Sequence, residues 1–228
     1  MQPTPCRPIN ALVPRPALWL RAFSFETLAL SPDSRRFALR LLLVCYVPVL
    51  LIWSGLIPCA YRFLVLAAVL LVLVAHGVHR GFDRRELGFT LAHSRQALGW
   101  NLFFLVVGAI TLFALDRAGW TMPLHSGYPL TAFLFYLFFL GPVQEIIFRS
   151  ILFAEMRKSG IVDGKWLVLI STCTFCFLHI IYPNPAVLLL TLVSGLVWGV
   201  LFLRWPSIWG VSLSHSLLGA LAMFLGIL

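Results

Sequence analysis

Hydrophobic residues run along this chain in seven long stretches, and polar residues gather mainly between them. A helix needs roughly 20 apolar residues to cross a bilayer core of about 30 Å. We therefore predict an all-α polytopic membrane protein, with residues 41–228 as one transmembrane domain of about seven helices. The predicted spans are Leu41–Ile57, Phe63–Val78, Ala97–Leu115, Leu130–Met156, Trp166–Tyr182, Ala186–Leu203 and Ser207–Leu228.

The first 40 residues form a separate N-terminal segment. Six prolines lie in it, and it lacks the long apolar core and small-residue cleavage site of a signal peptide. Pro16–Leu30 carries aromatic and aliphatic side chains with few charges. We interpret the segment as cytoplasmic and lying at the membrane interface; a disordered segment is the alternative.

Composition and charge support the same class of protein. The chain is 61% hydrophobic and 11% charged, against roughly 25% charged residues in soluble domains. Of its 17 Lys and Arg residues, 14 fall in the N-terminal region and in alternate loops. The positive-inside rule then predicts a cytoplasmic N-terminus. The net charge of +9 is therefore a topology signal, which favours lipid headgroups rather than nucleic acid as partners.

The five cysteines predict neither a disulfide framework nor a metal site. Their number is odd and most of them lie inside predicted spans. Cys173 and Cys176 have CxxC spacing, but the chain has no second pair to complete a zinc site. Packing residues are the favoured interpretation, and we predict no metal and no cofactor.

The fourth span carries polar side chains where an apolar helix is expected. From Leu130 to Ala154 its only ionisable residues are Tyr136, Glu145 and Arg149. Charges at membrane depth are costly unless they are paired, so they mark candidate functional sites. Glu145 and Arg149 stand at i, i+4 and can pair. Gln144 lies about 100° around the helix from Glu145.

The backbone around these residues is expected to be irregular. Gly141 and Pro142 come just before Gln144, and a proline inside a helix frees a carbonyl one turn earlier. We therefore predict a kink at this point, beside the polar side chains.

Two histidines lie in later spans, His179 in the fifth and His215 in the seventh. A carboxylate and two imidazoles can activate water and stabilise an oxyanion, and the same groups can bind a metal. Each also has a structural interpretation. A membrane histidine can simply bond to a neighbouring backbone, and Glu145 with Arg149 can be a structural clamp.

The order and spacing of these residues resemble a known family. Its motifs are Glu-Glu-x-x-x-Arg, Phe-x-x-x-His and His-x-x-x-Asn. The chain has Gln144-Glu145-x-x-x-Arg149, Phe175-x-x-x-His179 and His215-x-x-x-Gly219. These motifs look like those of the CPBP family, the CAAX-protease and bacteriocin-processing proteins. The resemblance extends from about Leu87 to Leu228. It implies a glutamate-type intramembrane endopeptidase, similar to the eukaryotic CAAX prenyl protease type II.

The resemblance also implies roles for individual residues. The residue at position 144 and His179 would activate water, and His215 would stabilise the oxyanion. Arg149 would fix the carboxylates, with Glu145 as its partner. Phe175 and Gly219 would contact the substrate, and no cofactor is implied.

This sequence departs from the family pattern at two positions. Gln144 replaces the first glutamate, and a carboxamide does not accept a proton from water at neutral pH. Three explanations are open: a substitution that traps an inactive enzyme, a natural variant with Glu145 as the base, or a pseudoprotease. Gly219 replaces the asparagine, so one expected oxyanion donor is missing, for which Ser214, Ser216 or water can substitute.

The sequence thus predicts an intramembrane endopeptidase, inactive as given because of Gln144, that acts on a membrane-tethered peptide or a C-terminal sorting signal. Its predicted location is a prokaryotic inner membrane. A pseudoprotease that binds peptides or confers immunity is the first alternative. A small proton-coupled transporter is the second, weakened by the lack of an inverted repeat.

Overall fold

The computed structural model describes residues 32–120, 130–182 and 184–227. The predicted interfacial segment Pro16–Leu30 lies outside the described residues. The described part of residues 31–228 is built from helices, which confirms the all-α class.

Several helices join end to end into longer rods. The first rod contains α1 (Pro32–Leu41), a π-helical turn (Leu42–Tyr46) and α2 (Val47–Trp53). A 3-10 turn (Cys59–Tyr61) leads into α3 (Arg62–His79), and α4 spans Ser94–Arg117. The fourth rod contains α5 (Leu130–Phe135), α6 (Gly141–Glu145) and α7 (Leu152–Lys158), joined by π-helical turns at Tyr136–Leu140 and Ile146–Ile151. The remaining helices are α8 (Gly164–Leu178), extended by a 3-10 turn (His179–Ile181), α9 (Pro185–Arg204) and α10 (Ile208–Phe224).

Six of these rods are long and apolar enough to cross a membrane, which confirms the membrane class. They are Pro32–Trp53, Cys59–His79, Ser94–Arg117, Leu130–Lys158, Gly164–Ile181 and Pro185–Arg204. The seventh predicted span contains the shorter apolar helix α10, of 17 residues. At 1.5 Å per residue α10 is about 26 Å long, slightly less than a typical hydrocarbon core.

The first rod begins nine residues before the predicted span, at Pro32 rather than Leu41. Arg35 and Arg36 are exposed, and their charges lower the local hydropathy, so the apolar pattern does not predict this part of the helix. Its other face is buried through Ser34 and Phe37. The Ser34 hydroxyl donates to the carbonyl of Ser159, 3.0 Å away, which attaches α1 to the end of α7.

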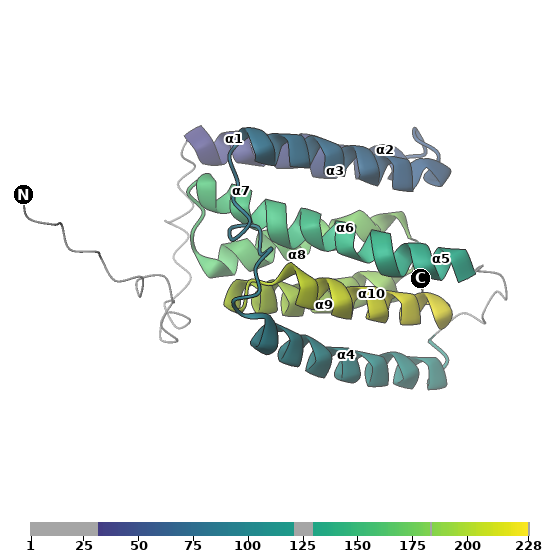
Figure 1. Ribbon diagram of the computed structural model, residues 1–228. Helices are drawn as coiled ribbons and strands as arrows, with labels where there is room; N and C mark the ends of the chain where they lie inside the picture. Colours follow the sequence, from purple (N-terminus) through teal and green to yellow (C-terminus); the bar gives the residue numbers. More distant parts are fainter. Residues whose placement is uncertain (1–31, 121–129, 183, 228) are drawn as a thin grey trace, which may run out of the picture. The chain divides into compact units, whose positions relative to one another are not determined.

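Within residues 31–228, the fourth rod, α8, α9 and α10 lie between α1–α3 on one side and α4 on the other (Figure 1). The outer helices expose large apolar side chains, such as Leu71 and Val78 on α3 and Ile110 on α4. Such side chains are stable against lipid, whereas polar side chains must face protein or a wet cavity. Polar side chains are therefore expected on the inner helices, where protein surrounds them.

The fourth rod remains helical through Pro142, where the sequence predicts a kink. The helix widens on both sides of α6. The Gly141 N–H bonds to the Tyr136 carbonyl and the Leu152 N–H to the Ile147 carbonyl, each five residues earlier. Single π-helical turns of this kind are frequent at functional sites. Here they flank the turn that carries Gln144 and Glu145.

A second buried carboxylate joins the fourth rod to the outer helices. Glu155 on α7 is paired with Arg40 of α1, and it also contacts two side chains at the end of α3. These are His76, at 3.2 Å from Nε2 to Oε2, and Arg80, at 3.5 Å from Nε to Oε2. The cluster holds α1 and α3 against the inner helices.

Close approach of α10 to the fourth rod depends on Gly141. A Cβ on Gly141 would lie 3.0 Å from Ser216 Cα and would overlap the Ser216 hydroxyl. We expect Gly141→Ala to lower the free energy of unfolding by about 1–3 kcal/mol, as overpacking does. Thermal unfolding in detergent measures the effect. Gly99→Ala on α4 is the matched control, because nothing lies within 4 Å of its added Cβ. Equal melting temperatures for the two variants would contradict the assigned packing.

Candidate active site

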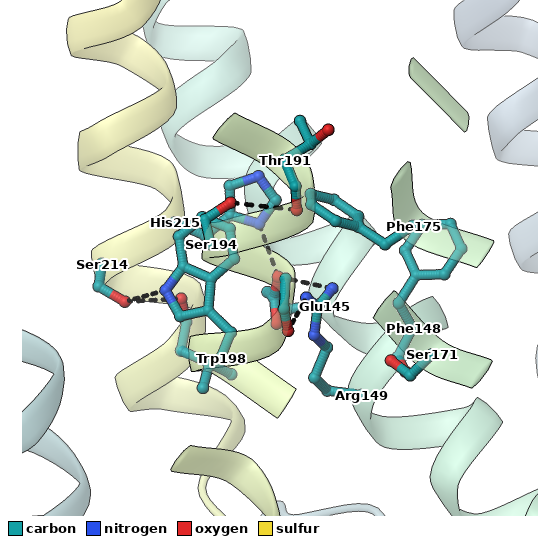
Figure 2. A network of polar contacts seen from close by, with 12 residues as sticks. Glu145, Phe148, Arg149, Ser171, Phe175, Thr191, Ser194, Trp198, Ser214 and His215 are labelled. Atoms are coloured by element: carbon teal, nitrogen blue, oxygen red, sulfur yellow. Dashed lines mark hydrogen bonds and ion pairs between the residues drawn. The ribbon is translucent and has the colours of Figure 1, made fainter. Parts of the chain in front are cut away.

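The pair predicted from i, i+4 spacing is present and fully buried. Arg149 Nη1 lies 3.3 Å from Glu145 Oε1, and both side chains have no exposed surface. Arg149 Nη2 also donates to the carbonyl of Gly195 on α9, at 3.2 Å. The guanidinium carbon lies 4.5 Å from the ring centre of Phe175 on α8, within cation–π range. Arg149 thus connects the fourth rod to α8 and α9 (Figure 2).

Glu145 is also bonded to a histidine from α10. His215 Nδ1 lies 2.6 Å from Glu145 Oε1. An ionised carboxylate only accepts hydrogen bonds, so Nδ1 carries the proton and Nε2 of the neutral ring carries the lone pair. The Tyr136 hydroxyl lies 3.2 Å from this Nε2, and it therefore donates to His215. Glu145, His215 and Tyr136 form a chain of hydrogen bonds.

The His215 ring is held in place by its neighbours. Trp198 of α9 stacks on it with 4.4 Å between ring centres and 16° between the planes. The Trp198 Nε1–H donates to the Ser214 hydroxyl at 2.9 Å, and that hydroxyl donates to Asn101 Oδ1 at 2.7 Å. The buried Asn101 side chain of α4 thereby fixes the orientation of both rings.

His179 presents its ring in a similar way. Its Nδ1 lies 2.9 Å from the Phe175 carbonyl, one turn earlier on α8. Because a carbonyl accepts, Nδ1 is the donor and Nε2 of the neutral ring is again the acceptor. Both predicted histidines therefore present lone pairs rather than N–H donors at Nε2.

A mainly apolar cavity of about 210 Å³ lies beside these groups. Its walls come from α4, the fourth rod, α8, α9 and α10. They include six residues of the site: Tyr136, Phe175, His179, Trp198, His215 and Gly219. Glu145 is absent from the described lining, and its carboxylate is linked to the cavity through His215.

Gln144 is buried but stands apart from this chain of hydrogen bonds. Its Oε1 has no hydrogen-bond partner among the described residues, and Gln144 is absent from the described cavity wall. The structure thus gathers most of the predicted site around the cavity, but it leaves the family's expected base position outside the wall.

The described residues contain no group of three or more His, Cys, Asp or Glu side chains placed to hold a metal ion. Cys173 is exposed, and the Cys176 thiol lies 3.4 Å from the Leu188 carbonyl. The Cys176 contact suits the packing interpretation, whereas the exposure of Cys173 does not bear on it.

Three residues of the site had no predicted role. Trp198 and Asn101 are unmarked in the sequence, because their importance comes from contacts between helices. Tyr136 carried a weak signal, as one of three ionisable residues between Leu130 and Ala154.

Fold and site define a polytopic helical membrane protein with a buried carboxylate–imidazole pair beside an apolar cavity. Residues 125–221 match the family model described as type II CAAX prenyl endopeptidase Rce1-like. This segment contains all three predicted motifs, so the predicted resemblance is confirmed over this part of the chain. The match is shorter than the predicted Leu87–Leu228. Searches of curated proteins and of solved structures returned no match.

The buried ion pair makes a testable prediction about stability. Arg149→Met leaves the buried Glu145 carboxylate without its cationic partner, which typically costs about 3–5 kcal/mol. Adding Glu145→Gln removes the uncompensated charge, so the double variant should regain part of the lost melting temperature. Arg36→Met is the control, since the Arg36–Asp33 pair is largely exposed. A double variant that melts no higher than Arg149→Met would contradict this account.

Proposed function

We propose that this protein is an intramembrane endopeptidase that cleaves a membrane-tethered peptide, with the Glu145–His215 pair as its water-activating group. The observation that carries the proposal is the 2.6 Å bond from His215 Nδ1 to Glu145, with the same ring on the wall of the cavity. A carboxylate that holds Nδ1–H leaves the lone pair on Nε2, which can act as a general base once a water replaces the Tyr136 hydroxyl there.

The reaction follows from this tautomer. A water between His215 and a substrate carbonyl gives its proton to Nε2 as its oxygen bonds to the carbonyl carbon. The imidazolium is stabilised by Glu145 and then passes the proton to the leaving nitrogen, as the C–N bond breaks. His179 Nε2 can accept the second hydrogen of the water and orient it.

The charges in the site balance during this reaction. Arg149 and Glu145 together are neutral, so forming the imidazolium adds one positive charge in a buried site. The tetrahedral intermediate adds one negative charge in the cavity at the same moment. Opposite charges attract strongly at low dielectric, which stabilises this intermediate relative to one whose negative charge has no partner.

The surroundings of the cavity favour a peptide held at the membrane. Its wall is mainly apolar, and Val107 on α4 and Val193 on α9 are both wall residues and exposed on the outer surface. A substrate can therefore reach it from lipid. A membrane-anchored peptide or a C-terminal sorting signal fits this access, and an inner-membrane location is part of the same proposal.

A pseudoprotease that binds peptides is the second candidate. It is favoured by Gln144, whose carboxamide stands where the family pattern has a glutamate and whose Oε1 is buried without a described partner. In that case the cavity would bind a peptide, and the Glu145–His215 pair would serve only to hold α10 in place.

The test is cleavage of a library of membrane-anchored peptides by the purified protein in proteoliposomes. We expect the unaltered chain to cleave and His215→Ala to lower kcat by about 10²–10⁴-fold, the usual contribution of general acid–base catalysis. Glu145→Gln should lower kcat as well, because without the carboxylate the proton of His215 is held less firmly on Nδ1. The control is His79→Ala, an exposed histidine at the end of α3.

Two results would overturn the proposed role of Glu145 and His215. Cleavage by Gln144→Glu alone would assign the base to position 144 and make the unaltered chain a disabled protease. Peptide binding without cleavage by either form, unaffected by His179→Ala, would instead support the pseudoprotease.

A further inference from the structure

Tyr136 of the fourth rod lies against a glycine of α10, one helical turn beyond His215. A Cβ on Gly219 would overlap both the ring and the hydroxyl of Tyr136. The Tyr136 side chain is itself buried, and it begins the π-helical turn Tyr136–Leu140. The phenol therefore occupies the space that a side chain at position 219 would need.

Position 219 lies on the same face of α10 as His215 and lines the same cavity. Residues four apart lie on one face of a helix, and both His215 and Gly219 are on the cavity wall. A polar side chain at 219 would thus stand beside the reacting groups, but glycine supplies none. The Tyr136 hydroxyl stands there instead, 3.2 Å from His215 Nε2.

We propose that Tyr136 is a catalytic hydrogen-bond donor, which takes the place of the missing side chain at position 219 and stabilises the oxyanion. The proposal rests on the endopeptidase function above. In the resting state the hydroxyl donates to His215 Nε2. The reacting water must displace this hydroxyl, because Nε2 has one lone pair. The displaced hydroxyl then turns about its C–O bond toward the carbonyl oxygen, which becomes negative as Nε2 takes the proton.

The other hydroxyls of the described cavity wall are already committed to their own helices. Thr111 donates to the Val107 carbonyl at 2.9 Å, and Thr191 to the Leu188 carbonyl at 3.0 Å. Ser194 lies 3.4 Å from the carbonyl of Thr191. Turning any of these toward a substrate would break a bond to the backbone, whereas the Tyr136 hydroxyl is released when the reacting water takes its place on His215 Nε2.

The remaining candidates also fail as donors. The two histidines present Nε2 lone pairs in their neutral forms, as their Nδ1 bonds require. The Ser214 hydroxyl, which the sequence suggested as a substitute, donates to Asn101. Ser216, the other suggestion, is packed against Gly141 and is absent from the described cavity wall.

The first test is Tyr136→Phe, which removes the hydroxyl and keeps the ring over Gly219. Loss of one oxyanion donor typically lowers kcat by about 10²–10³-fold, and we expect KM to change by less than about threefold. Tyr46→Phe is the matched control, because its hydroxyl bonds to Thr174 at 3.2 Å and Tyr46 is not a described wall residue. A kcat for Tyr136→Phe within twofold of the unaltered chain would overturn the proposal.

A binding measurement separates this proposal from the endopeptidase function. A membrane-anchored phosphinic peptide imitates the charged tetrahedral intermediate, and the corresponding uncleaved peptide imitates the substrate. Tyr136→Phe should bind the phosphinic peptide at least tenfold more weakly and the uncleaved peptide equally well. Equal affinities for the phosphinic peptide would overturn the donor role, even for a chain that cleaves no peptide. Absence of cleavage with the expected difference in affinity would count against the endopeptidase function alone.

An exchange of side chains tests the shared space. Gly219→Asn alone should lower the melting temperature strongly, because the new side chain overlaps Tyr136. Combined with Tyr136→Ala, the asparagine has room, and we expect both the melting temperature and part of the cleavage rate to recover relative to Tyr136→Ala alone. Recovery of stability with no recovery of rate would show that the space is shared but that the donor role is wrong.

Discussion

The inner helices are organised around the charge of Glu145. A carboxylate without exposed surface is stable only when cations or hydrogen-bond donors compensate it. Arg149 comes from the same helix, whereas His215 comes from α10. Arg149 in turn needs the Gly195 carbonyl of α9 and the ring of Phe175 on α8. One buried charge thus specifies how four separate segments meet.

The fourth rod carries a second buried carboxylate ten residues further on, about 15 Å along the helix. Glu155 contacts Arg40 of α1 as well as His76 and Arg80 at the end of α3. The two carboxylates act on different neighbours, since Glu145 holds the inner helices and Glu155 holds the outer ones. A single rod therefore positions the candidate site and also attaches the helices that shield it.

Small residues decide where the polar groups can meet. The absence of a side chain at Gly141 leaves space for Ser216, and its absence at Gly219 leaves space for Tyr136. Helix α10 therefore approaches the fourth rod closely at two points, one helical turn apart on α10. Helices in membranes commonly associate through small residues in this way. The second contact does more than pack, because it delivers a hydroxyl to the histidine that lies one turn away.

Much of this protein was determined by local sequence. Apolar runs predicted the membrane helices, because a bilayer demands long apolar segments. The i, i+4 spacing predicted the Glu145–Arg149 pair, because helix geometry is fixed, and the three motifs predicted the family later matched over residues 125–221. The start of the first rod was not predicted, because the charges of Arg35 and Arg36 lower the local hydropathy although Phe37 on the other face is buried.

Only the tertiary structure decided which groups face one another across helices. The sequence paired Glu145 with Arg149 alone, but packing adds His215. The expected base position, Gln144, lies outside the described cavity wall, and Tyr136 lies where Gly219 leaves space. Such contacts depend on the rotation and depth of each helix. Many side chains together set these, and no single motif encodes them.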